Sequence, residues 1–281
     1  MKNRNKIIEN SLKICLDKRS KDLRKNILDA LFFANRGHFG SSMSLVEIFR
    51  VLYDNIVNFD PKKPNMENRD RVVLSKGHGC LALYSILADK NFFNKNQFKK
   101  FLALDSILGG HPEAHKVPGV EASTGALGHG LPIAVGMAIS LKLKKKKSKV
   151  FVIIGDGELN EGSNWEALLS ASKHNLNNLK IILDYNKIQS YDKIKNVLNL
   201  EPLSEKFKSF GIHVSEINGH CINQLKSNFK KFLSNKKSKP SITICHTIKG
   251  KGFKLAENNP LWHHRNEFSI SEKKMMYQSI K

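Results

Sequence analysis

The second half of the sequence alternates short apolar runs with segments of helical periodicity, and this alternation restricts the possible folds more than any other feature. Apolar runs of strand length occur at residues 149–154, 179–183, 212–217 and 241–246. Apolar residues at helical spacing fill the segments between them, at 164–174, 203–210 and 222–233. Strands that alternate with helices in this way are typical of a parallel sheet covered on both faces. We therefore predict an α/β fold with a doubly wound parallel sheet and helices on both faces.

The first half of the chain contributes helices, one short strand and a long loop. Apolar spacing predicts helices at 7–33, 44–56 and 80–88, the first divided by a polar break at 18–21, and a buried strand at 71–74. Residues 104–130 are rich in Gly, His and Pro and predict a loop longer than an ordinary connection, which usually carries function. We expect a single domain over residues 1–281 with a helical extension at its N-terminus.

The chain is strongly basic, with a formal net charge of +22 at pH 7. Clustered basic residues can bind nucleic acid, but the lysines here are mostly dispersed along the sequence. The densest runs, at 142–149 and 226–239, are expected where amphipathic helices end in solvent. We therefore expect a solvated, lysine-rich surface, and no nucleic-acid partner.

Cysteine usage and hydropathy indicate a cytoplasmic protein. The four cysteines form no CxxC pair, which argues against a zinc site and a disulfide framework. The longest apolar run, Val150 to Ile154, is far shorter than the roughly 20 residues that span a membrane. The N-terminus also lacks the apolar stretch of a secretory leader, so we expect no membrane association.

Oxygen-bearing side chains follow two successive predicted strands. Asp156 lies between Gly155 and Gly157 directly after the strand at 149–154, and Asn186 follows the next strand, thirty positions further on. A Gly-Asp-Gly sequence alone is usually a tight turn, but an intervening helix and strand would bring both residues to adjacent strand ends. Ligands of such sheets bind beyond the carboxyl ends of the strands. Carboxylate and amide oxygens suit Mg²⁺, and Gly157 would let the backbone approach a diphosphate.

Histidines recur directly after glycines, at His38, His78, His111, His129 and His220, and a further pair follows Trp262 at His263 and His264. A single Gly-His is usually a capped turn. Several in glycine-rich loops indicate neutral donors and acceptors around a polar ligand. His220 follows an Asn-Gly turn that leads into a helix, so we assign it a structural role. We see no histidine or cysteine spacing typical of zinc.

From about Leu23 to His264 the sequence resembles the thiamine-diphosphate-dependent transketolases. The matching strings are GHFGSSMSLVEI, DRVVLSKGHGCLALYSILA, GGHPEAHKVPGVEASTGALGHGLPIAVGMA, GDGELNEGSNWEA and DYNKIQ. The resemblance implies the diphosphate-binding (PP-type) domain of the thiamine-diphosphate fold, with Mg²⁺ held by Asp156, Asn186 and the carbonyl of Ile188. It implies cofactor contacts at His78, Gly125, Leu127, Gly155, Asp156, Gly157, Glu158, Asn186, Ile188 and His263. It also implies that the residues acting on the sugar substrate are His38, His111, His263 and His264.

The resemblance further implies a reaction and a partner. In this family the cofactor carries a two-carbon ketol unit from a ketose, or ketose phosphate, to an aldose or aldose phosphate. Single-chain transketolases continue for more than another such length, whereas this sequence stops at Lys281. We therefore expect a separate C-terminal subunit with the pyrimidine-binding domain, the activating glutamate and most sugar-phosphate contacts, in a dimer of such pairs.

Three positions depart from the family pattern. His129 stands where glutamine is usual, Arg36 precedes Gly37 where a small residue is common, and Arg265 follows the histidine pair where glycine is common. The last change leaves His263 and His264 as alternatives for the active-site histidine, and we favour His263. These departures concern the acceptor sugar rather than the cofactor.

Other assignments stay open at this stage. Glu158 and Glu161 either face a partner subunit or begin a helix, where its dipole favours acidic residues, and Trp165 is expected in the core. A fragment of a 1-deoxyxylulose-phosphate synthase and the alpha chain of a 2-oxoacid dehydrogenase are alternatives within the enzymes, although the GHPE and TGALGHG strings favour transketolase. A non-catalytic binding or assembly subunit with a basic surface is the alternative of another class.

Overall fold

The computed structural model describes residues 2–234, 238–265 and 267–281, and its centre is a five-stranded sheet. The strands are β1 (Arg71–Leu74), β2 (Val150–Gly155), β3 (Leu179–Tyr185), β4 (His213–Asn218) and β5 (Ser241–His246). Their order in the sheet is β1-β2-β3-β5-β4, and every neighbouring pair is parallel. The predicted parallel sheet is therefore confirmed. The short strand β1, from the first half of the chain, forms one edge of the sheet and lies beside β2.

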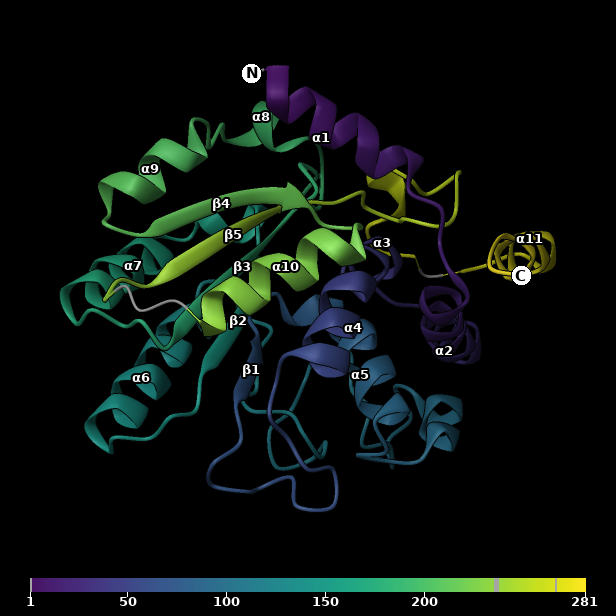
Figure 1. Ribbon diagram of the computed structural model, residues 1–281. Helices are drawn as coiled ribbons and strands as arrows, with labels where there is room; N and C mark the ends of the chain where they lie inside the picture. Colours follow the sequence, from purple (N-terminus) through teal and green to yellow (C-terminus); the bar gives the residue numbers. More distant parts are fainter. Residues whose placement is uncertain (1, 235–237, 266) are drawn as a thin grey trace.

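Helices cover both faces of the sheet (Figure 1). One face packs on α2 (Lys18–Ala34), α4 (Val46–Asn55), α5 (Cys80–Asp89) and α10 (Ile222–Leu233). The other face packs on α6 (Gly130–Leu143), α7 (Gly162–Lys173) and α9 (Leu203–Ser209). Successive residues of β2 point to opposite faces, so Phe151 lies in the first core and Val152 in the second. Burial on both faces explains why this strand is an unbroken apolar run.

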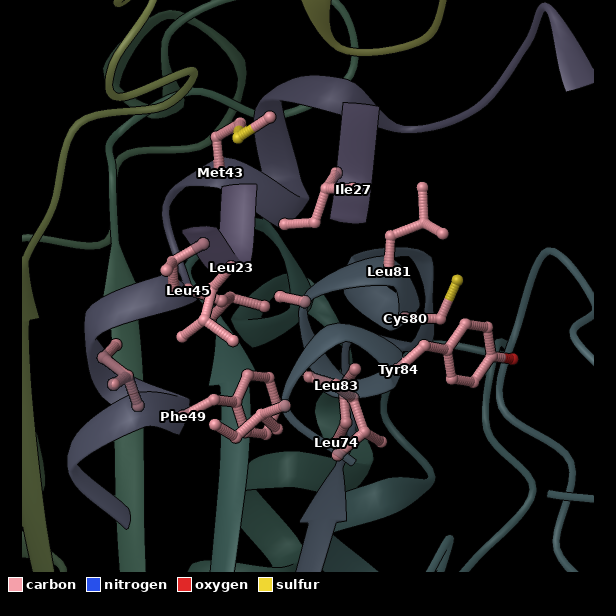
Figure 2. Close-up of a cluster of buried hydrophobic side chains, with 14 of the residues drawn as sticks. Leu23, Ile27, Met43, Leu45, Phe49, Leu74, Cys80, Leu81, Leu83 and Tyr84 are labelled. Atoms are coloured by element: carbon pink, nitrogen blue, oxygen red, sulfur yellow. The ribbon is translucent and has the colours of Figure 1, made fainter. Parts of the chain in front are cut away.

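The first core joins the N-terminal helices to the edge of the sheet. Figure 2 shows Leu23 and Ile27 of α2, Phe49 of α4 and Leu83 of α5 converging above Leu74 at the end of β1. This packing fixes the turn that leaves β1.

The break between the first two helices lies earlier than predicted. Helix α1 (Lys2–Lys13) ends before residue 14, and α2 begins at Lys18, so the expected break at 18–21 is wrong by about one turn. The cause is Asp17, whose carboxylate accepts from the backbone N–H of Ser20 at 2.9 Å and caps α2. The helix expected at 44–56 is found as α4, and a short helix that was not predicted, α3 (Phe39–Met43), precedes it.

Two further features complete the fold. Residues 104–129 form turns, as the long-loop prediction requires, and short helices occur at α8 (Ile194–Val197) and in single 3₁₀ turns. The sequence analysis did not anticipate α11 (Ile270–Ser279), which a Ser269–Glu272 capping box begins. Of the lysine run at 226–239, residues 235–237 lie outside the described residues. Within the described residues, no helix has both the length and the apolarity to cross a membrane.

Candidate functional site

The predicted site residues meet at the carboxyl ends of β1, β2 and β3, in two adjoining hollows. The inner hollow, of about 60 Å³, is lined by Ser41, Lys76, His78, Leu127, Gly155, Asp156, Gly157, Glu158, Asn186, Ile188, Gln189, Ser190, Lys249 and His263. The outer hollow, of about 210 Å³, is lined by Arg36, Gly37, His38, His78, Cys80, Leu81, Phe101, Leu102, Gly110, His111 and His264. His78 lines both. The inner hollow therefore gathers all of the predicted cofactor residues except Gly125, and the outer one gathers His38, His111 and His264 of the four histidines expected to face the sugar.

The oxygens predicted to bind Mg²⁺ belong to the inner hollow. Gly155 of β2 pairs with Asp184 of β3, so the loops that follow these strands are neighbours. The Asp156 carboxylate accepts from the backbone N–H of Gly157 at 2.8 Å and from that of Lys187. The side-chain oxygen of Asn186 accepts from the backbone N–H of Ile188 at 3.1 Å. These bonds hold the carboxylate, the amide and the Ile188 carbonyl in one rigid loop pair.

The donor set suits a hard cation that also takes ligand oxygens. Among the residues that the structure describes, no three His, Cys, Asp or Glu side chains converge as a metal site. A cation here would use one carboxylate, one amide and one backbone oxygen, together with oxygens from a bound diphosphate, as Mg²⁺ commonly does. Burial and the nearby Asp184 carboxylate raise the pKa of Asp156 to about 6. A cation beside Asp156 would remove this penalty, so the residues present fit Mg²⁺.

Asp184, which sequence reasoning did not single out as a site residue, is paired with a buried lysine. The Lys76 ammonium lies 2.6 Å from the Asp184 carboxylate, and both side chains are almost completely buried. Asp184 also accepts from the hydroxyls of Ser44, at 2.7 Å, and of Thr247. Although burial alone would raise it, the charge of Lys76 and these hydrogen bonds lower the pKa of Asp184. Lys76 of this pair lines the inner hollow, and its charge is balanced by Asp184.

A second buried ammonium, that of Lys249, reaches the same hollow from the segment after β5. Its Nζ donates to the carbonyl oxygens of Ile188 at 2.9 Å and Gln189 at 3.2 Å, and to Nδ1 of His263 at 2.7 Å. Burial, together with the charge of Lys76, lowers the pKa of Lys249 to about 7. Two buried ammonium groups at one small hollow form an anion site, because a bound anion would offset the cost of burying them. Both lysines follow strands and precede glycine, in SKGH and IKGKG, and this position is the signal that sequence reasoning missed.

Five histidines surround the passage between the hollows. The ring centroid of His38 lies 5.5 Å from those of His78 and His263, 5.9 Å from that of His111 and 4.7 Å from that of His264. Burial and neighbouring positive groups lower the pKa of His38 to about 4 and that of His263 to about 3. The pKa values of His78 and His111 are also lowered, chiefly by burial. At neutral pH the imidazoles of these last four histidines, His38, His263, His78 and His111, are uncharged, and each can donate one hydrogen bond and accept another.

The two C-terminal histidines line different hollows. His263 lines the inner hollow, where its Nδ1 faces Lys249 and its Nε2 lies 3.3 Å from the Ser190 hydroxyl. His264 lines the outer hollow beside His38. Because a protonated Lys249 can only donate, Nδ1 of His263 accepts and Nε2 carries the proton.

Two further predicted residues, Gly125 and Glu158, make contacts that support the walls of the hollows. Gly125 packs against the ring of His111, since a Cβ there would lie 3.1 Å from that ring. The buried carboxylate of Glu158 accepts from the backbone N–H groups of Gly128 at 3.0 Å and Gly155 at 3.1 Å, and from the Ser75 hydroxyl. Glu158 lies in the first turn of a short 3₁₀ helix (Gly157–Asn160), as one of the two alternatives expected, and its carboxylate also ties the glycine-rich segments together.

The remaining assignments from sequence are also placed. His129 is exposed at the start of α6, and His220 is buried against Glu47, so only three of the five Gly-His histidines belong to the site. Trp165 packs on Phe207 and donates to the carbonyl of Leu159 at 2.8 Å, in agreement with a core role. Glu161 is exposed at the N-terminal end of α7, where an acidic side chain favours the helix dipole.

A parallel α/β sheet whose strand ends gather oxygen ligands, two buried ammonium groups and neutral histidines defines a domain that binds a diphosphate cofactor with a hard cation. Residues 17–266 match the family described as transketolase, thiamine diphosphate binding domain. The chain belongs to the transketolase family. It corresponds to the part of those enzymes that binds thiamine diphosphate.

Relatives of similar length are named as subunits of transketolases. The chain is 42% identical over 253 residues to an apulose-4-phosphate transketolase subunit of Actinobacillus succinogenes, covering 89% of this chain and 90% of that protein. It is 36% identical over 241 residues to the 6-deoxy-6-sulfo-D-fructose transketolase subunit SqwG of a Clostridium species, covering 86% and 87%. Names of this kind imply a separate partner chain.

Solved structures of longer transketolases share the fold. The chain superposes on a transketolase of Pichia stipitis with a TM-score of 0.87 and 30% identity, over 94% of this chain and 40% of that one. The transketolase of Campylobacter jejuni gives a TM-score of 0.86 and 32% identity, over 93% and 42%. The chain thus spans about two fifths of these longer transketolases.

Proposed function

We propose that this chain is the N-terminal, cofactor-binding subunit of a two-chain transketolase that transfers a two-carbon ketol unit from a ketose or ketose phosphate to an aldose or aldose phosphate. The observation that supports it most is the inner hollow, where the Asp156 and Asn186 loops of adjacent strands meet the buried ammonium groups of Lys76 and Lys249. Thiamine diphosphate supplies the nucleophilic carbon of this chemistry when it is bound. The whole chain, residues 1–281, serves as one PP-type domain with α1 as an N-terminal extension.

The chain's own residues bind and orient the cofactor. Asp156, Asn186 and the carbonyl of Ile188 hold Mg²⁺, and Gly157 and the side chains of His78, Lys76 and Lys249 face the diphosphate. A Cβ on Gly157 would lie 2.9 Å from the Cβ of Gln189, so a larger residue would narrow the hollow. Gly125 and Leu127 lie toward the aminopyrimidine side. Gly155 and Glu158 shape the loop between them.

Four histidines act on the sugar. His38, His111, His263 and His264 line the route from the outer hollow to the inner one and exchange protons with the hydroxyl and carbonyl groups of the substrate. The lowered pKa values of His38, His111 and His263 keep these three uncharged at neutral pH, so they both donate and accept hydrogen bonds. The substrate is a sugar or sugar phosphate, as in the pentose phosphate reactions or in a specialised sugar pathway.

A separate C-terminal subunit completes the site. It carries the pyrimidine-binding domain and the activating glutamate, and two such pairs form a heterotetramer in the cytoplasm. Exposed apolar residues adjoin the inner hollow and support this docking. Tyr191, next to Ser190 in the hollow wall, is 89% exposed, and Leu261, two residues before His263, is 80% exposed. Large exposed apolar side chains of this kind mark surfaces that a partner covers.

The test is the reaction catalysed by the two chains together. With its C-terminal subunit, thiamine diphosphate and Mg²⁺, this chain should transfer a ketol unit from a ketose phosphate to an aldose phosphate, measured by the appearance of the product ketose. Release of CO₂ from pyruvate in the same assay would instead support the synthase alternative.

A further inference from the structure

The backbone on both sides of Lys249 is held by buried side chains from distant parts of the chain. On one side, the backbone N–H of Ile248 donates to Nε2 of His220 at 2.9 Å. On the other side, Nε of Arg24 donates to the carbonyl of Lys251 at 3.0 Å. The segment that carries Lys249 is therefore fixed at the residue before it and at the second residue after it.

One carboxylate, that of Glu47, contacts both of these side chains, Arg24 and His220. Glu47 of α4 accepts from Arg24 at 2.6 Å and 3.0 Å, through both of its oxygens, and it contacts Nδ1 of His220 at 2.7 Å. All three side chains are fully buried. Burial would raise the pKa of Glu47, but the charge of Arg24 and the hydrogen bond from His220 hold it well below its usual range. Glu47 thus remains a carboxylate that orients both partners.

The hydrogen bonds fix the tautomer of His220. A backbone N–H can only donate, so Nε2 of His220 must accept from Ile248, and the ring proton must sit on Nδ1, where it points at Glu47. Only the neutral ring with its proton on Nδ1 satisfies both partners. Glu47 therefore prepares His220 to hold the Ile248 backbone.

The position of the Lys249 backbone matters because neighbouring residues confine the Lys249 side chain. A Cβ on Gly40 would lie 3.0 Å from Cγ of Lys249, and the backbone N–H of Gly250 donates to the Gly40 carbonyl at 3.0 Å. At the far end, the ammonium must reach the Ile188 carbonyl and His263 together. A shift of about 1 Å in the backbone would stretch these bonds beyond hydrogen-bonding length.

We propose that Arg24, Glu47 and His220 are positioning residues. They act through the backbone at 248 and 251 and direct the ammonium of Lys249 toward the Ile188 carbonyl and the proposed diphosphate-binding site. This inference rests on the proposed function, because it concerns the affinity of the inner hollow for thiamine diphosphate. His220 is the member whose contribution can be separated by substitution. An Asn side chain keeps a donor near Nδ1 but loses the acceptor near Nε2, whereas Gln offers an acceptor near Nε2.

The experiment is calorimetric titration of thiamine diphosphate with Mg²⁺, under the conditions in which the wild-type chain binds it, alone or with its C-terminal subunit. His220→Asn should weaken binding roughly 10-fold or more, the range seen when residues that orient a ligating group are changed. His220→Gln should stay much closer to the wild type. In a Lys249→Met background, His220→Asn should cause no further loss, because its effect passes through Lys249.

The matched control is Leu225→Ala, which removes buried apolar contacts of α10, the helix that follows His220 in the chain. It should lower the thermal stability and leave the affinity for thiamine diphosphate unchanged. The positioning role is overturned if His220→Asn binds as the wild type does, if its loss adds fully to that of Lys249→Met, or if Leu225→Ala weakens binding equally. Absence of binding by the wild-type chain in either setting would instead overturn the proposed function.

Discussion

Lys249 and His263 meet end to end, with the ammonium of the one 2.7 Å from Nδ1 of the other. The same ammonium contacts the carbonyl of Ile188, which belongs to the loop expected to bind Mg²⁺. The Lys249 side chain thus connects the loop after β3 to His263, near the C-terminus. The inner hollow and the histidines that we propose act on the sugar are therefore directly connected.

Replacing Lys249 by Met should separate cofactor affinity from stability. Burial lowers the pKa of Lys249 to about 7, so the fold gains little from its charge, and an apolar side chain of similar length should leave the free energy of unfolding within about 1 kcal/mol of the wild type. The affinity for thiamine diphosphate should fall by roughly 10-fold or more, because a buried charge aimed at the diphosphate is lost. Denaturant unfolding and calorimetry measure the two quantities. Unchanged affinity would remove Lys249 from the cofactor site.

Lys76 should behave differently, since it neutralises a buried carboxylate. Lys76→Met leaves Asp184 charged and without its cation, which should cost about 3 to 5 kcal/mol of unfolding free energy. The double variant Lys76→Met with Asp184→Asn should recover a large part of that loss, because the uncompensated charge is gone. Urea denaturation of the two variants checks this. A double variant no more stable than the single one would contradict the pairing.

The histidine cluster predicts a loss of stability in mild acid. An unfolded histidine takes up a proton near pH 6.5, whereas His38 and His263 in the folded chain resist protonation until about pH 4 and 3. As the pH falls from about 6.5 to 4, the unfolded state binds more protons, so the free energy of unfolding decreases, by on the order of 1 to 2 kcal/mol for each histidine at pH 5. Above pH 6.5 these two groups contribute no pH dependence.

The measurement is the unfolding midpoint at pH 7 and pH 5 for the wild type and for His38→Gln. The variant should lose less stability than the wild type between these two pH values, because Gln does not titrate. Equal losses would show that His38 is not held neutral by the fold. Asp156 and Lys249, with pKa values of about 6 and 7, also titrate in this interval, but both groups are present in the wild type and in His38→Gln, so they affect the two proteins alike.

The sheet and the meeting of the loops that carry Asp156 and Asn186 could be predicted from the sequence because their signals are local. An apolar run of five residues marks β2 wherever its neighbours lie, and the helix and strand between Asp156 and Asn186 bring both residues to the same edge of the sheet. The strand order could not be predicted in this way. β5 lies between β3 and β4, and this insertion depends on packing between residues far apart in the sequence.

The buried charges were missed for a related reason. In a sequence with a net charge of +22, a lysine is by default a surface residue, and nothing local distinguishes Lys76 or Lys249 from the rest beyond the glycine that follows each. Their burial is decided by Asp184 and by the carbonyls of the loop after β3, which are distant in sequence. His220 was correctly assigned a structural role, but its contact with Ile248 could be found only in three dimensions.

The most direct test of the account is the calorimetric titration of thiamine diphosphate into this chain, with and without Mg²⁺, alone and with its C-terminal subunit, for the wild type and Asp156→Ala. The account predicts binding that requires Mg²⁺, tightens when the second subunit is present and disappears in Asp156→Ala. Binding that is absent in both settings, or that is the same in Asp156→Ala as in the wild type, would contradict a cofactor site at the ends of β2 and β3.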